Sequence, residues 1–119
     1  MQTSYHYHEN RPWGSFDQFT HDTQTTVKIL NVSANKRLSL QKHKHRSEFW
    51  HVISGNGTVT IETKELRARQ NDEFEIPADT IHRITGGNEG IRLLEIATGN
   101  FDENDIIRIE DDFGRTDAP

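Results

Sequence analysis

The chain carries the stretch QKHKHRSEFWH at residues 41–51, and PADTIH follows later at residues 77–82. Side chains two residues apart in a β-strand face the same way, so Gln41 and His43 project to one side of a strand. We expect a turn to bring Glu48 back on the neighbouring strand, and His82 to arrive from a distant one. Oxygen and nitrogen ligands of this kind suit zinc, iron, manganese, cobalt or nickel.

The overall composition indicates one domain spanning residues 1–119. The 14 basic and 19 acidic residues give a net charge of −5, which argues against a nucleic-acid groove. Cysteine is absent, which excludes disulfides and thiolate chemistry. No apolar run approaches the roughly 18 residues of a membrane span, and the N-terminus lacks the features of a signal peptide. We therefore expect a cytoplasmic protein with no membrane partner.

Short windows in which apolar and polar residues alternate predict an all-β fold. They cover residues 26–30, 37–41, 50–53, 58–61, 74–76 and 91–96. Turn residues fall between them at the spacing of a sandwich or barrel, and Ser54-Gly55-Asn56-Gly57 predicts a hairpin turn. Residues 102–109 are the exception, because they fit one or two helical turns. The large apolar side chains expected in the core are Trp13, Trp50, Phe16, Phe74 and Leu94.

The histidine and glutamate spacing is similar to that of the cupin superfamily. Four residues separate His43 from Glu48, and six more precede Gly55. Pro77 precedes His82 at the spacing of the second cupin motif. Gln41 takes the place of the first histidine of the template.

Several glycines of the cupin template are replaced. Asn35 and Asn71 stand at two glycine positions, Asp79 replaces the central glycine of the second motif, and Gly86 replaces its final asparagine. Asn and Asp tolerate left-handed backbone angles. We therefore expect these turns to be preserved.

The glutamine at position 41 points to one family. The chain resembles the cupin domain of type II phosphomannose isomerases, which is usually found behind a mannose-1-phosphate guanylyltransferase domain. The matching residues are Arg11-Pro12-Trp13-Gly14, Leu38-Ser39-Leu40-Gln41, His43, His45-Arg46, Glu48, Trp50, Ile76-Pro77, His82-Arg83, Leu94-Glu95, Gly99, Asp105-Ile106-Ile107-Arg108 and Phe113-Gly114-Arg115. Phe49 departs from the family, which commonly has histidine there, and the nucleotidyltransferase domain has no room in this chain.

The resemblance implies a cupin double-stranded β-helix (jelly-roll) barrel, with a core at about residues 11–115. It also implies a divalent metal, a homodimer, and interconversion of mannose 6-phosphate and fructose 6-phosphate.

Two ligand sets fit the spacing. The favoured set is Gln41, His43, Glu48 and His82, with zinc as the first choice of metal. The other replaces Gln41 by His45, although only two residues separate His45 from Glu48. His6 and His8 also alternate at strand spacing, but a second metal site there is not favoured.

An aldose–ketose isomerase needs a base that moves a proton between two carbons, and a cation that holds a phosphate. Candidate bases are Glu95, His45 and His51. Candidate cations are Arg46, which we also place in the catalytic set, and Lys44, Arg83 and Arg37. For each cation a solvated surface charge is the competing interpretation, and for Glu95 it is a salt bridge.

Three functions remain open from the sequence. The first is a metal-dependent sugar or sugar-phosphate isomerase. The second is a non-catalytic sugar-binding or regulatory cupin, and the third is a cupin oxygenase that uses iron. Sugar binding without turnover would favour the second, and oxygen consumption would favour the third.

Overall fold

The computed structural model describes residues 6–102 and 104–116, and this part of the chain forms nine β-strands. The strands are β1 Tyr7–Arg11, β2 Gly14–Gln18, β3 Thr25–Val32, β4 Leu40–Lys42, β5 Arg46–Ile61, β6 Lys64–Arg69, β7 Glu73–Ile76, β8 His82–Gly99 and β9 Ile107–Glu110. The predicted all-β fold is confirmed. Within the described ranges, no helix is long and apolar enough to cross a membrane.

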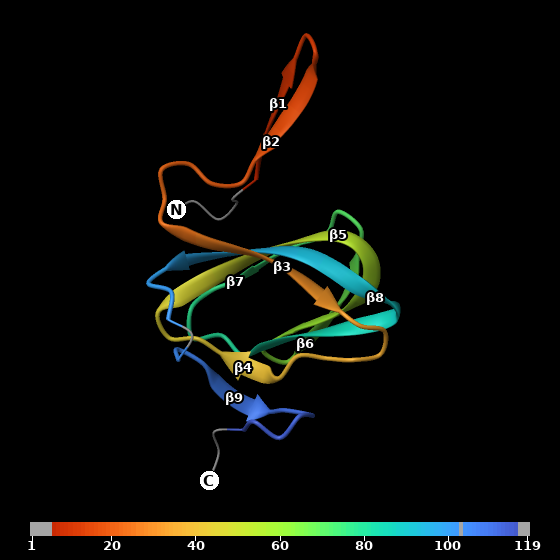
Figure 1. The fold of residues 1–119 in the computed structure, drawn as a ribbon, viewed down its shortest axis with the longest axis vertical. Helices are drawn as coiled ribbons and strands as arrows, with labels where there is room; N and C mark the ends of the chain where they lie inside the picture. Colours follow the sequence, from red (N-terminus) through yellow and green to blue (C-terminus); the bar gives the residue numbers. More distant parts are fainter. Residues whose placement is uncertain (1–5, 103, 117–119) are drawn as a thin grey trace.

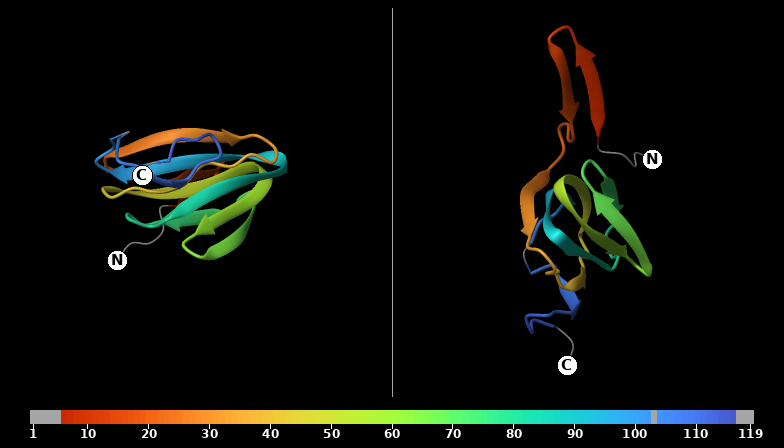
Figure 2. Two further views of the ribbon diagram at one scale, coloured as in Figure 1. Left: turned by 90° about the horizontal axis from the view of Figure 1, so that it is seen from below. Right: turned by 90° about the vertical axis from the view of Figure 1, so that its right-hand side faces the viewer.

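Two long strands, β5 and β8, organise the barrel (Figure 1). They pair antiparallel along their whole length, from Arg46 opposite Gly99 to Ile61 opposite His82. The first half of β5 also pairs with β7, and its second half pairs with β6. The far half of β8 pairs with β3, and its first residue pairs with β4. Each long strand therefore belongs to two faces of one curled sheet (Figure 2).

The hairpin turn predicted at residues 54–57 is wrong, because β5 runs straight through it. The register with β8 shifts between Val52 and Ser54 and again between Gly55 and Gly57, which marks β-bulges. Gly55 has a φ of 84°, and a Cβ there would collide with the carbonyl oxygen of Gly90. The glycines bend the strand from one face of the barrel to the other instead of reversing it.

The helical turns predicted for residues 102–109 are also wrong in the described part of that segment. A turn precedes β9, which pairs with β4. The pairing satisfies backbone groups that a helix this short would leave open at both ends.

The left-handed turns predicted at the replaced glycines are confirmed. Asn35, Asn71 and Asp79 have φ angles of 61°, 72° and 62°. These side chains tolerate the conformation that the cupin template assigns to glycine.

The core lies between the two faces of the barrel. Its buried residues are Val32, Trp50, Val52, Val59, Ala68, Ile76, Ile84, Ile91 and Leu93. The β1–β2 hairpin projects away from this core (Figure 1). Trp13 lies between those two strands with 72% of its surface exposed, so its expected place in the core is wrong.

Gly55→Ala should destabilise the barrel far more than Gly114→Ala. Both glycines have positive φ, at 84° and 78°, but only Gly55 has backbone atoms where a Cβ would stand. We expect roughly 1–2 kcal/mol of unfolding free energy to be lost from the left-handed strain in each variant. Gly55→Ala should lose about 1–3 kcal/mol more through overpacking. Urea unfolding measures the two losses of free energy, and equal losses in the two variants would contradict a special requirement for glycine at the Gly55 bulge.

Candidate functional site

Three buried side chains from different elements converge at one end of the barrel. His43 directly follows β4, Glu48 lies on β5 and His82 begins β8. Their exposed fractions are 4%, 1% and 1%. The potential ligand atoms of the three residues all lie within 4.8 Å of one another. The structure therefore brings Glu48 and His82 close to His43, as the spacing of these residues in the sequence led us to expect.

The two imidazoles face the carboxylate with their Nε2 atoms. His43 Nε2 lies 3.2 Å from Glu48 Oε2, and His82 Nε2 lies 3.5 Å from Glu48 Oε1. The Nδ1–H groups donate to backbone carbonyls, at 2.7 Å to Asp105 and 2.8 Å to Thr80. Those hydrogen bonds hold the tautomer that presents Nε2 to a metal, as is usual for metal-binding histidines.

Two atoms of this cluster are buried without a hydrogen-bond partner among the described residues. They are Glu48 Oε1 and His82 Nε2. Buried polar atoms are rarely left unpaired, because doing so costs about 1–3 kcal/mol each. A divalent cation between them would satisfy both, so the donor set fits a metal.

Gln41 lies beside this cluster. Its Cα pairs with that of His82 across β4 and β8, and directly opposed residues share a face of the sheet. Its Oε1 accepts a hydrogen bond from the buried Ser39 hydroxyl at 3.2 Å. His45, the competitor for this position, is exposed on the turn between β4 and β5.

Arg46 is the one cation among our four candidates that reaches the cluster. Its Nε donates to Glu48 Oε2 at 3.1 Å, and its Nη2 lies 3.2 Å from His43 Nε2. The guanidinium also lies over the ring of Phe101, with 4.3 Å between Cζ and the ring centroid. Arg46 therefore places a positive charge beside Glu48.

A second carboxylate, that of Glu95, lies beside the first. Its Oε2 accepts a hydrogen bond from Trp50 Nε1 at 3.2 Å. Burial, and then the charge of Glu48, raises the pKa of Glu95 to about 7. Burial alone would also raise the pKa of Glu48, but the imidazoles of His43 and His82 hold it well below its usual range. One carboxylate is thus fixed as an anion, while the other exchanges a proton near neutral pH.

The remaining candidates lie elsewhere. Lys44 is exposed on the same turn as His45. Arg37 pairs with Asp112 at the surface, at 2.7 and 2.8 Å. Arg83 is buried, but its guanidinium binds the Leu38 carbonyl at 2.9 Å and Glu110 at 3.2 Å. These contacts attach β8 to its neighbouring segments and occupy the side chain.

The role of Asp105 in the site and the location of His51 were not predicted. Asp105 holds the β4–β5 turn, since its carboxylate accepts the backbone N–H groups of Lys44 and His45 and its carbonyl orients His43. Its place in a matched motif was the only signal available from the sequence. His51, a candidate base, belongs to a different group, with His6 and Glu73.

Comparison with known proteins places this geometry in a family. Residues 1–111 match the family described as mannose-6-phosphate isomerase C-terminal. The alginate biosynthesis protein AlgA of Pseudomonas aeruginosa is 38% identical over 99% of this chain and 25% of that protein. A mannose-1-phosphate guanylyltransferase of Sinorhizobium fredii is 40% identical over 92% of this chain and 22% of that protein.

The solved structures show the same fold. A cupin protein from Bacteroides fragilis superposes with a TM-score of 0.60 at 24% identity, over 65% of this chain and 67% of that one. This likeness confirms the predicted cupin barrel. The chain spans about a quarter of the length of the curated relatives it matches. It belongs to the mannose-6-phosphate isomerase C-terminal family, as a single cupin domain that carries a buried His-Glu-His group.

Proposed function

We propose that this domain is a metal-dependent aldose–ketose isomerase that interconverts mannose 6-phosphate and fructose 6-phosphate. The observation that carries the proposal is the pairing of two unlike carboxylates at one buried site. Glu48 is held ionised between His43 and His82, while the pKa of its neighbour Glu95 is raised to about 7. Carboxylates with well-separated pKa values at one site are typical of acid–base catalysis.

In this proposal Gln41, His43, Glu48 and His82 hold one divalent metal, with zinc as the first choice. The unpaired Glu48 Oε1 and His82 Nε2 support this assignment. The bound metal would polarise the sugar carbonyl. The four ligands supply one negative charge, so the site keeps a net positive charge toward a carbonyl oxygen.

Glu95 is the proposed base. It takes the proton from the carbon next to the carbonyl and returns it to the other carbon. The hydrogen bond from Trp50 fixes the orientation of its carboxylate. Burial raises the pKa of this carboxyl, which favours a group that can both accept and release a proton.

Arg46 is the proposed cation for the substrate. Its guanidinium forms an ion pair with Glu48, and a bound divalent metal would take over that charge balance. The freed fork of N–H donors suits a phosphate or an enediolate oxygen. Lys44, on the exposed turn near Arg46, is a second candidate for the phosphate.

His43→Ala and His82→Ala should each remove one equivalent of tightly bound divalent metal. Loss of a supporting group alone costs about 10–100-fold in metal affinity, so loss of a ligand should cost at least that much. Calorimetric titration with zinc measures the change. His21→Ala is the matched control, because the His21 side chain is exposed and forms an ion pair with its neighbour Asp22. Unchanged metal content in both ligand variants would contradict the ligand set.

Glu95→Gln should lower turnover by roughly 10²-fold or more while metal is retained, because the amide keeps the size and removes the base. The assay is interconversion of mannose 6-phosphate and fructose 6-phosphate. A panel of other aldoses and aldose phosphates tests the choice of sugar.

Two experimental outcomes would assign a different function to this domain. Tight sugar binding without turnover in the wild-type protein would identify a sugar-binding or regulatory domain. Oxygen consumption with bound iron would identify an oxygenase. Full turnover of Glu95→Gln would remove Glu95 from the mechanism and leave the isomerase assignment standing.

Isomerisation in deuterated water should place deuterium on the product carbon that gains a proton. A side-chain base such as Glu95 exchanges its proton with solvent between abstraction and return. Mass spectrometry or proton NMR of the product measures the label. A product with no deuterium on carbon would favour a hydride shift over a base that exchanges its proton with solvent.

A further inference from the structure

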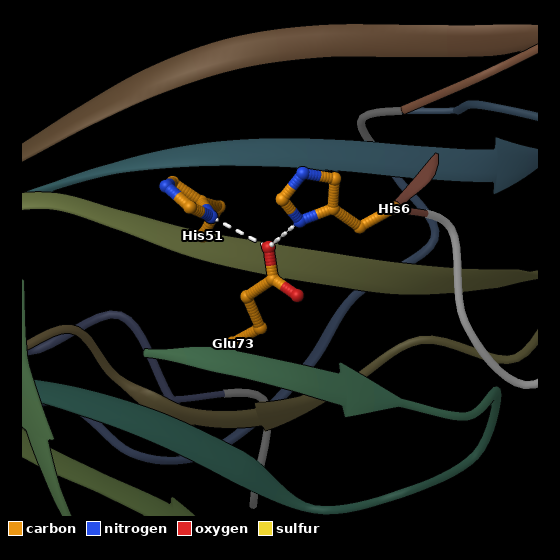
Figure 3. A group of neighbouring side chains, drawn as sticks. All are labelled: His6, His51 and Glu73. Carbon is orange, nitrogen blue, oxygen red and sulfur yellow. Dashed lines mark hydrogen bonds and ion pairs between the residues drawn. The ribbon is translucent and has the colours of Figure 1, made fainter. Parts of the chain in front are cut away.

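A second group of potential ligands lies outside the barrel interior. His51 on β5 and Glu73 on β7 are paired across the two strands. His6, which immediately precedes β1, reaches the same point from the N-terminal segment (Figure 3). The potential ligand atoms of the three residues all lie within 4.8 Å of one another. This group shares no residue with the buried cluster of His43, Glu48 and His82.

One carboxylate oxygen receives both imidazoles. Glu73 Oε2 lies 2.6 Å from His6 Nδ1 and 2.7 Å from His51 Nδ1 (Figure 3). The other nitrogen of His6, Nε2, lies 2.6 Å from Asp17 Oδ1. Both ring nitrogens of His6 therefore face a carboxylate oxygen. Such a ring either carries two protons, or carries one proton and gives its other nitrogen to a metal.

We propose that His6, His51 and Glu73 form a second divalent-metal site, of the zinc class. His6 and His51 would ligate through Nδ1, and Glu73 through Oε2. Asp17 would accept the Nε2–H of His6 from outside, the arrangement in which a carboxylate orients a zinc-binding histidine. Two imidazoles and a carboxylate are a common zinc set that leaves a fourth position open.

Charge and space agree with this assignment. Two carboxylates and two neutral imidazoles carry the two negative charges that balance a divalent cation. These side chains border a surface cavity with a volume of about 420 Å³. It is lined by His6, His8, Asp17, Phe19, His51, Asn71 and Glu73.

The side chains can open to admit the ion. Zinc bonds of about 2.0–2.2 Å place tetrahedral ligand atoms roughly 3.3 Å apart. The present contacts of 2.6 and 2.7 Å would therefore widen by under about 1 Å. His6, His51 and Glu73 are partly solvent-exposed, at 25%, 18% and 27%, so small rotations meet little packing.

The site would attach the β1–β2 hairpin to the barrel. His6 precedes β1 and Asp17 lies on β2, while His51 and Glu73 belong to the barrel. Phe19 packs between the two parts, with its ring centroid 4.6 Å from that of His6 and 5.5 Å from that of His51. A metal there would tie the hairpin to the barrel, and its loss should loosen the hairpin without unfolding the barrel.

The test is zinc stoichiometry measured by calorimetric titration of the whole chain. Wild-type protein should bind two equivalents, and His51→Ala and Glu73→Gln should each bind one fewer. His21→Ala is the control and should keep both. His82→Ala separates this inference from the proposed function, because it removes the buried site alone and should keep one equivalent. Zinc stoichiometry unchanged in both His51→Ala and Glu73→Gln would overturn the proposal.

Hydrogen exchange gives a second readout that needs neither turnover nor the buried site. Zinc should slow amide exchange in residues 7–18 of wild-type protein and of His82→Ala, and should have no such effect in His51→Ala. Circular dichroism checks that the variants keep the barrel. Zinc-independent exchange of the hairpin in wild-type protein would also overturn the proposal.

Discussion

The continuous antiparallel pairing of β5 with β8 is the constraint on which the rest of the structure depends. Glu48 lies near one end of the β5–β8 ladder and His82 lies at the other end, and the bend in both strands brings these two ends together. A one-residue slip would turn every side chain of a strand to the other face. The bulges at Gly55 and Gly57 allow the strand pair to bend without losing that register.

Burying the carboxylate of Glu48 at the end of the barrel costs desolvation free energy, which neighbouring groups offset. Glu48 is 1% exposed, and an isolated buried carboxylate would become protonated. Arg46 supplies a countercharge, while Asp105 and Thr80 orient the two histidines through their carbonyls. The charge and the orientation of this His-Glu-His group are therefore set by residues outside it.

The proximity of Glu95 to Glu48 gives the site its asymmetry. Two carboxylates close together in a buried site resist ionising at the same time, so the one with cationic neighbours stays charged and the pKa of the other is raised. Trp50, completely buried in the core, donates to Glu95. Core packing and acid–base character therefore depend on the same side chain.

The sequence by itself determined the strand alternation, the cupin spacing of His43, Glu48 and His82, and the left-handed turns at Asn35, Asn71 and Asp79. Each of these is a local property, since a strand repeats every two residues and a turn is set by its own side chains.

Only the tertiary structure decided the rest. Local turn residues at 54–57 favour a reversal, yet pairing with β8 carries β5 through them as a bulge. Arg46 lies in the buried cluster while its neighbour His45 is exposed. His6, His51 and Glu73 meet although His51 lies 45 positions after His6 in the chain, and Glu73 lies 22 positions after His51. Contacts of this kind depend on register and packing between distant strands, which no local pattern encodes.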